Sequence, residues 1–208
     1  MQKKGKGFFN LETTLEYAAD QFKNCDPEET ASRAAVEFNN EKQSLTVFFL
    51  QEPYTVMYPS GEIYAAGGDK ASVYVSIILL HYLNTSDGTP LSGRWISFKE
   101  LPGGQIYIEP FRKRALVPFL KVFGDSPSQF MEAASKTGGF HNKATGEYSM
   151  VIPVLPRVPV NFILHPGDEE FSAAGNILFD SNASCYLPTE DYAHLPGMII
   201  RQMQMAVK

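Results

Sequence analysis

The residues best suited to chemistry lie around His165, in a stretch rich in prolines and carboxylates. Asp168 and Glu169 follow this histidine in a turn sequence, and Glu190 and Asp191 open a predicted helix farther along the chain. An imidazole with several carboxylate oxygens suits acid–base catalysis or a divalent cation. A solvated turn, and a helix start whose dipole favours acids, explain the same residues structurally. We favour this structural interpretation and expect no tightly bound transition metal, because the usual pair of helix-borne ligands is missing.

A second group of residues surrounds Trp95, the only tryptophan. Arg94 and Lys99 contribute cations, and Gly103 and Gly104 close the segment. An aromatic ring between cations and flexible glycines can stack on a planar ligand and hold an anionic group. If one surface binds a ligand or cofactor, we expect it here, and the identity of that molecule stays open. The alternative is a loop folded over the core with Trp95 as its anchor.

His81 stands in segment 71–83, which is apolar nearly all round. We predict a buried central helix, although the β-branched residues also suit a strand. The imidazole is expected to bond to a backbone or tyrosine partner rather than to haem or a metal. Asp69 precedes this segment in a Gly-Gly-Asp-Lys turn and is predicted to be the N-cap, with an anion-binding turn as the alternative. The basic run 112–114 is predicted to be a solvated helix face.

Local signals predict the elements that hold these residues. A helix over 11–23 is expected with Asn10 as its cap, and Asp26-Pro27 marks the start of a second helix. β-rich runs between 44 and 66, broken at prolines, predict a three-stranded antiparallel meander. Further predictions are a helix from Glu109 kinked at Pro118, a helix from Pro127 ending at Gly138, strands at 158–164 and 176–179, and a last helix over 198–207.

These elements predict an α+β fold with antiparallel sheet meanders and segregated helices. A chain of 208 residues suits one globular domain over 1–208. Two similar lobes, about 1–93 and 94–208, are an alternative, because segments 53–64 and 159–171 share one order. In both segments a proline is followed by an apolar strand, which ends in an aromatic residue or histidine directly before a second proline. A glycine, an acidic residue and an aromatic residue then follow in that order. A duplicated lobe would explain the match, and so would chance reuse of a hairpin pattern.

Composition narrows the class of protein. A net charge of −5 disfavours nucleic-acid binding, which depends on cationic residues. The N-terminal lysines lack the apolar region of a signal peptide, and no stretch approaches the length of a membrane span. Two cysteines, predicted to be unpaired, suit a reducing compartment, so we expect a cytoplasmic protein with no membrane partner. The chain has no G-x-S-x-G, H-E-x-x-H, C-x-x-C or dinucleotide-binding glycine motif.

Three blocks of the chain carry a resemblance to a known family. The blocks LLHYLNTSDGTPLSGRWISFKELPGGQIY, PRVPVNFILHPGDEEFSA and ILFDSNASCYLPTED resemble the uncharacterised prokaryotic domain-of-unknown-function family 3786. That family occurs largely in anaerobes, and some members carry a four-cysteine iron–sulfur domain in front, similar to the one in corrinoid iron–sulfur proteins. The resemblance therefore implies a loose association with corrinoid or one-carbon chemistry. Cys25 and Cys185 lie far apart in this chain, so no iron–sulfur role is carried over to them.

The expected function is recognition of a small-molecule ligand or a partner protein by a cytoplasmic binding or accessory domain. The alternative is an enzyme that uses His165 and the nearby carboxylates, with or without a divalent metal. Neither expectation specifies an oligomeric state or the chemical identity of the ligand.

Overall fold

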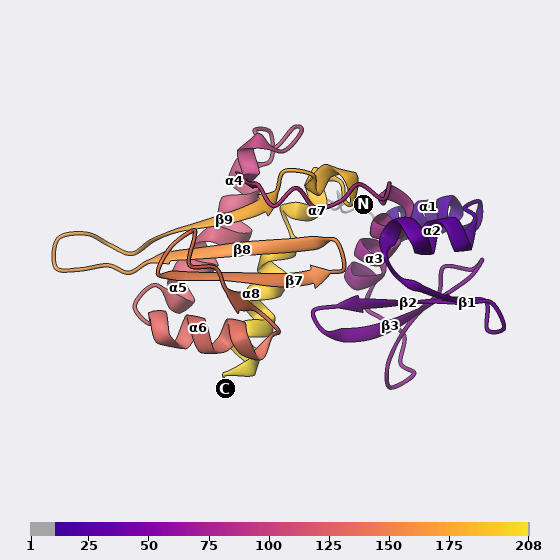
Figure 1. Cartoon of the computed structure of the whole chain (residues 1–208), viewed down its shortest axis with the longest axis horizontal. Helices are drawn as coiled ribbons and strands as arrows, with labels where there is room; N and C mark the ends of the chain where they lie inside the picture. Colours follow the sequence, from indigo (N-terminus) through magenta and orange to yellow (C-terminus); the bar gives the residue numbers. More distant parts are fainter. Residues whose placement is uncertain (1–10, 208) are drawn as a thin grey trace, which may run out of the picture.

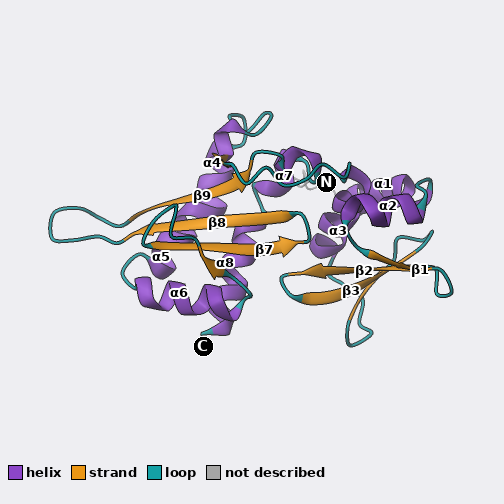
Figure 2. Cartoon of the chain, viewed as in Figure 1, coloured by secondary structure: helices purple, strands orange, loops and turns teal. Residues whose placement is uncertain are grey.

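The computed structural model describes residues 11–207, so the predicted cap Asn10 lies outside the described residues. Two antiparallel sheets are accompanied by segregated helices, which confirms the predicted α+β class. Figure 1 and Figure 2 show the larger sheet on the left and the smaller sheet on the right, each with its own helices. Within residues 11–207, no helix combines the length and apolar character needed to cross a membrane.

The first lobe contains α1 (Leu11–Lys23), α2 (Pro27–Ala34), β1 (Glu37–Asn39), β2 (Ser44–Phe49), β3 (Glu52–Met57), β4 (Ile63–Ala65) and α3 (Val73–Thr85). Its strands pair antiparallel in the order β1-β2-β3-β4, which confirms the predicted meander and adds β1 to it. The carboxylate of Asp26 accepts the N–H of Glu29 at 2.8 Å, and Pro27 takes the first position of α2. This start was predicted because capping depends on residues within one turn.

The predicted central helix is confirmed as α3, with a different cap. The hydroxyl of Ser72 accepts the N–H of Val75 at 3.4 Å and caps the helix. The prediction of Asp69 as the cap is wrong, because Asp69 lies in the preceding turn, where its carbonyl accepts the N–H of Ala65 at 2.9 Å. Most of α3 is buried, and the hydroxyl of Tyr82 donates to the carbonyl of Ala34 at 2.6 Å.

The second lobe contains β5 (Trp95–Ser97), η1 (Phe98–Glu100), α4 (Ile108–Phe111), the π-helical turn η2 (Arg112–Leu116), α5 (Val117–Phe123), α6 (Pro127–Lys136), β6 (Phe140–His141), β7 (Tyr148–Leu155), β8 (Val158–His165), β9 (Ala174–Asp180), η3 (Ala183–Cys185), α7 (Thr189–Tyr192) and α8 (Leu195–Ala206). Its strands are antiparallel in the order β5-β9-β8-β7-β6. The strands predicted at 158–164 and 176–179 are confirmed within β8 and β9. The last helix begins at Leu195, earlier than predicted, with a proline in its first turn.

The helical path from α4 to α5 contains a wider turn just before Pro118. In η2 the N–H of Val117 bonds to the carbonyl of Arg112, five residues back. Pro118 has no N–H to donate to the carbonyl of Arg114, so regular α-helical bonding is interrupted here. The irregularity predicted at Pro118 therefore takes the form of a π-helical turn. Gly197 of α8 packs against this turn, since a Cβ on it would lie 2.8 Å from the carbonyl oxygen of Arg114.

The two lobes have a similar chain order and a continuous core. Each has helices, then a four-stranded meander, then helical structure, with β5 added at the edge of β9. The similar segments 53–64 and 159–171 both begin in the third strand of a meander, β3 and β8. One cluster of buried apolar side chains extends through both lobes. The N–H of Leu50, at the end of β2, also bonds to the carbonyl of Val154 in β7 at 2.9 Å.

Candidate functional site

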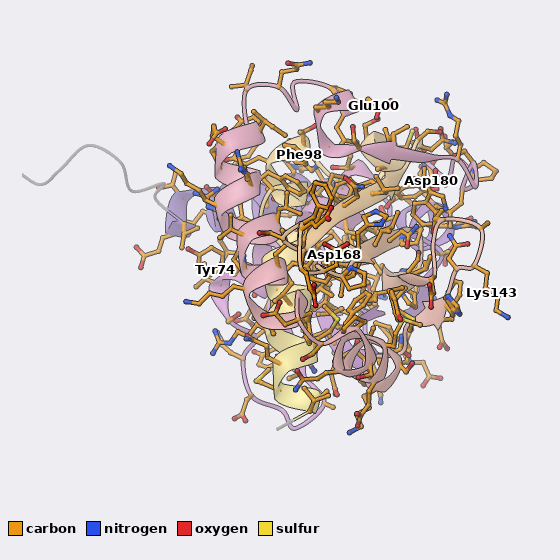
Figure 3. All side chains as sticks on the ribbon, turned by 90° about the vertical axis from the view of Figure 1, so that its left-hand side faces the viewer. Tyr74, Phe98, Glu100, Lys143, Asp168 and Asp180 are labelled. Atoms are coloured by element: carbon orange, nitrogen blue, oxygen red, sulfur yellow. The ribbon has the colours of Figure 1, made fainter. Side chains whose placement is uncertain are left out.

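The residues around His165 lie on an exposed hairpin. His165 ends β8, and Asp168 and Glu169 follow in the exposed loop before β9, at the far end of the larger sheet (Figure 1). The carboxylate of Asp168 accepts the N–H groups of Phe171 and Glu170 at 2.7 and 2.9 Å, and these bonds lower the pKa of Asp168. Figure 3 looks onto this end of the molecule and places Asp168 near its centre. The contacts support a structural turn here.

Glu190 and Asp191 open α7 as predicted, but they lie in a different part of the molecule from His165. Figure 1 shows α7 close to the first lobe and the β8–β9 loop at the opposite end of the sheet. The structure therefore does not bring these carboxylates to His165. Instead, both of them line a cavity together with His81. His165 keeps only Asp168 and Glu169 of the predicted carboxylates in its own loop.

Trp95 lies half-buried on β5, the edge strand of the larger sheet, opposite Asp180 of β9. Arg94 and Lys99 flank this strand with exposed side chains. None of these residues lines the cavity or the groove described below. This placement favours Trp95 as an anchor of the sheet edge.

The glycines after Trp95 are needed by the backbone itself. Gly103 has a φ of +72°, which L side chains rarely adopt, and a Cβ on Gly104 would overlap the carbonyl oxygen of Phe98. The N–H of Gly104 bonds to the carbonyl of Leu101 at 2.9 Å. Phe98, labelled in Figure 3, stacks on Phe111 with ring centroids 4.2 Å apart. The two glycines therefore close a tight turn over the core.

A cavity of about 290 Å³ lies between the two lobes. Its walls come from α1 and α3 of the first lobe and from η2, α7 and the start of α8 of the second. The apolar part of its lining consists of Leu11, Tyr74, Ile77, Ile78 and Met198. The charged and titratable part consists of His81, Arg114, Glu190, Asp191 and His194. An apolar wall with a few convergent polar groups is the usual composition of a small-molecule site.

His81 and Asp191 form a pair across the junction of the lobes. Nδ1 of His81 lies 2.7 Å from Oδ2 of Asp191, which is only 7% exposed. A carboxylate only accepts hydrogen bonds, so in the neutral imidazole Nδ1 carries the proton and Nε2 keeps the lone pair. The expectation of a backbone or tyrosine partner for His81 is therefore wrong.

Arg114 and His194 form a second pair on the wall of the second lobe. Nη1 of Arg114 lies 3.0 Å from Nε2 of His194. A guanidinium only donates, so Nε2 accepts and the proton of the neutral imidazole is on Nδ1. Burial and the charge of Arg114 lower the pKa of His194, and the neutral ring is favoured beside the guanidinium. The side chain of Arg114 is exposed, as predicted for its basic run, yet it also lines the cavity.

Glu190 adds a carboxyl group whose proton is held more tightly than usual. Burial and the charge of Asp191 raise the pKa of Glu190, and Arg114 and His81 oppose this shift. The cavity thus combines a guanidinium, an imidazole lone pair and a carboxyl group whose pKa is raised. Within residues 11–207, no three His, Cys, Asp or Glu side chains are grouped so that they could hold a metal ion.

The cavity adjoins a larger groove of about 600 Å³. Tyr74, Arg114, His194 and Met198 line both spaces. The groove continues between the β2–β3 hairpin and α8, where its lining includes Phe49, Leu50, Glu52, Tyr54, Arg201 and Met205. Tyr74 is 52% exposed, and its ring centroid lies 6.5 Å from that of His194. Tyr74 therefore marks the boundary between cavity and groove, on the left in Figure 3.

Two residues of the cavity were not identified as candidates from the sequence. Arg114 belongs to a basic run that resembles any solvated helix face, and His194 stands in no recognised motif. The local signals near them are Pro118, which disturbs the helix carrying Arg114, and Gly197, which permits the close approach of α8. Both signals indicate unusual packing, and neither indicates a binding site.

Comparison with known proteins gives one match. A family model described as a domain of unknown function (DUF3786) matches residues 26–202. This range contains all five charged and titratable residues of the cavity. No curated protein and no solved structure matches the chain.

Proposed function

The chain belongs to the family described as a domain of unknown function (DUF3786), and we propose that it binds a small anionic metabolite in the cavity between its lobes. The observation that carries the proposal is the convergence of Arg114–His194 and His81–Asp191 on one cavity. Arg114 can hold a carboxylate through two parallel hydrogen bonds. Its neutral partner His194 accepts one guanidinium N–H and adds no competing positive charge.

The volume of the cavity supports a small ligand. At about 290 Å³ it lies at the lower end of the range for small-molecule sites. A corrinoid is far larger than such a ligand. We therefore propose that any link to the corrinoid or one-carbon chemistry implied by the resemblance is through a small carboxylate. We also propose a cytoplasmic setting, which the two free cysteines, Cys25 and Cys185, support.

Calorimetric titration and thermal shift can test the proposal. The panel contains short monocarboxylates, dicarboxylates, phosphate monoesters and a corrinoid. A ligand at 100 times its Kd should stabilise the protein by about 2.7 kcal/mol and raise Tm by roughly 5–11 °C. We expect this effect for a small carboxylate and not for the corrinoid.

Matched variants locate the site. Arg114→Gln should weaken binding about 10- to 100-fold, because a hydrogen bond to a charged group contributes about 1.5–3 kcal/mol. Arg112→Gln alters an exposed neighbour outside the cavity and should keep wild-type affinity. Trp95→Phe should also keep it. Loss of binding in Trp95→Phe with normal binding in Arg114→Gln would refute the proposal and place the ligand at the sheet edge.

A further inference from the structure

We propose that the cavity is also an active site, in which His81 removes a proton from the carbon next to the carbonyl group of a short 2-oxo acid. This inference rests on the proposed ligand binding and adds chemistry to it. The product of the step is the enol of the acid. The residues involved are His81 and Asp191 as base and positioning residue, Glu190 as proton donor, and Arg114 as the anchor of the carboxylate.

The His81–Asp191 pair has the arrangement of a general base and its positioning residue. The 2.7 Å bond places the imidazole proton on Nδ1, so Nε2 is the atom that can accept a proton from a substrate. Proton uptake makes His81 an imidazolium next to the carboxylate of Asp191, which is almost fully buried. The hydrogen bond to Asp191 fixes the orientation of the ring while the proton is transferred. His81 lines the cavity, so the pair lies at a space that can hold a substrate.

The other charged groups favour a monoanion with a carbonyl group. Arg114 is the one cationic lysine or arginine among the residues that line this cavity, while Glu190 and Asp191 are both acidic. A phosphate dianion would meet those two carboxyl groups and only one guanidinium. A carboxylate matches the planar guanidinium, and a protonated Glu190 can donate its proton to a carbonyl oxygen. The apolar side chains Ile77 and Ile78 suit a short hydrocarbon chain.

The step balances without any further reactant. The C3–H bond of the 2-oxo acid breaks, and its proton moves to Nε2 of His81. The electron pair of that bond forms the C2=C3 double bond, and the carbonyl oxygen takes the proton of Glu190. The products are the enol of the acid, the imidazolium of His81 and the carboxylate of Glu190. The total charge is unchanged. Reversal in D₂O, after His81 has exchanged its proton with solvent, returns deuterium to C3.

The experiment is deuterium exchange into 2-oxobutyrate, followed by ¹H NMR of the C3 methylene in D₂O with the full chain present. Wild type should exchange this position faster than buffer alone. His81→Gln and Glu190→Gln should each slow the catalysed exchange about 100-fold or more. His165→Gln, which alters an exposed histidine on the distant hairpin, should leave it unchanged.

A second measurement keeps the inference testable if the His81 variant does not fold. ¹⁵N NMR of histidine-labelled wild type should show, for the neutral ring of His81, a protonated Nδ1 and an unprotonated Nε2, with the signals assigned by removing His141, His165 and His194 in turn. Asp191→Asn should change this tautomer balance whatever the role of the pair, and it should also slow the exchange, which a purely structural pair would not do. A protonated Nε2 with a bare Nδ1 would overturn the inference.

Parallel calorimetry separates the two proposals. If 2-oxobutyrate binds in a manner that depends on Arg114 but is not exchanged above the buffer rate, the catalytic inference is overturned and the proposed binding function stands. If 2-oxobutyrate does not bind, the catalytic inference also fails, and the binding function is judged on the wider panel. Exchange that persists in His81→Gln would show that another group is the base.

Discussion

Replacing Asp180 with asparagine is expected to destabilise the protein by about 3 kcal/mol, because this buried carboxylate holds the segment that joins the lobes. Asp180 ends β9 and is only 3% exposed. Its Oδ1 accepts the N–H and hydroxyl of Ser92 at 3.1 and 2.9 Å and the N–H of Asn182 at 2.9 Å. Its Oδ2 accepts the N–H of Gly93 at 2.8 Å. The carboxylate thus ties the linker to the segment that leads into α7 and the cavity.

The magnitude follows from the geometry of the replacement. Asparagine has one accepting oxygen, so its amide nitrogen must face either the N–H of Gly93 or the donors of Ser92 and Asn182. A buried donor without a partner costs about 1–3 kcal/mol. The bonds that persist also lose the strength that the carboxylate charge provides. A total of about 3 kcal/mol corresponds to a decrease in Tm of roughly 6–12 °C for a chain of this length.

Urea unfolding and calorimetry of Asp180→Asn measure this effect directly. Asp125→Asn is the matched control, since Asp125 is exposed, and it should change stability by no more than about 0.5 kcal/mol. A Tm for Asp180→Asn as close to wild type as that of the control would refute the reasoning, because it would mean that the linker finds other partners at no cost.

Two further predictions concern the cavity and the sheet edge. Because burial and Asp191 raise the pKa of Glu190 above its ordinary 4.5, the folded state holds this proton more tightly, and stability is lost as pH rises from 4.5 through the folded pKa. Glu190→Gln should therefore be more stable than wild type at pH 8 and equal to it at pH 4 in urea unfolding; a gain of the same size at both pH values would contradict this. Gly104→Ala should lower stability by about 1–3 kcal/mol because the new Cβ meets the backbone of Phe98, whereas Gly67→Ala, whose Cβ meets nothing within 4 Å, should be nearly neutral. Equal melting temperatures for these two variants would show that the turn can relax.

Local signals were sufficient to predict most helices and strands. Asp26 and Pro27 mark the start of α2 because they act within a single turn of helix. The apolar run that became α3 predicted burial because its residues have no polar face to turn towards water. β1 was not predicted, since Glu37–Asn39 contains one apolar residue and is a strand only through its pairing with β2. The cap is Ser72 and not Asp69, because α3 begins at Val73, four residues after Asp69.

The sequence by itself determined the fold class, the meanders and the elements that carry the cavity residues. The tertiary structure alone decided which of those residues meet. His81 finds Asp191 at a separation of 110 residues, and Arg114 finds His194 at a separation of 80. His165 has carboxylates near it in the sequence, yet it ends an exposed hairpin. The physical reason is that capping, periodicity and turn formation act over a few neighbouring residues, whereas the cavity exists only where helices of the two lobes pack against each other.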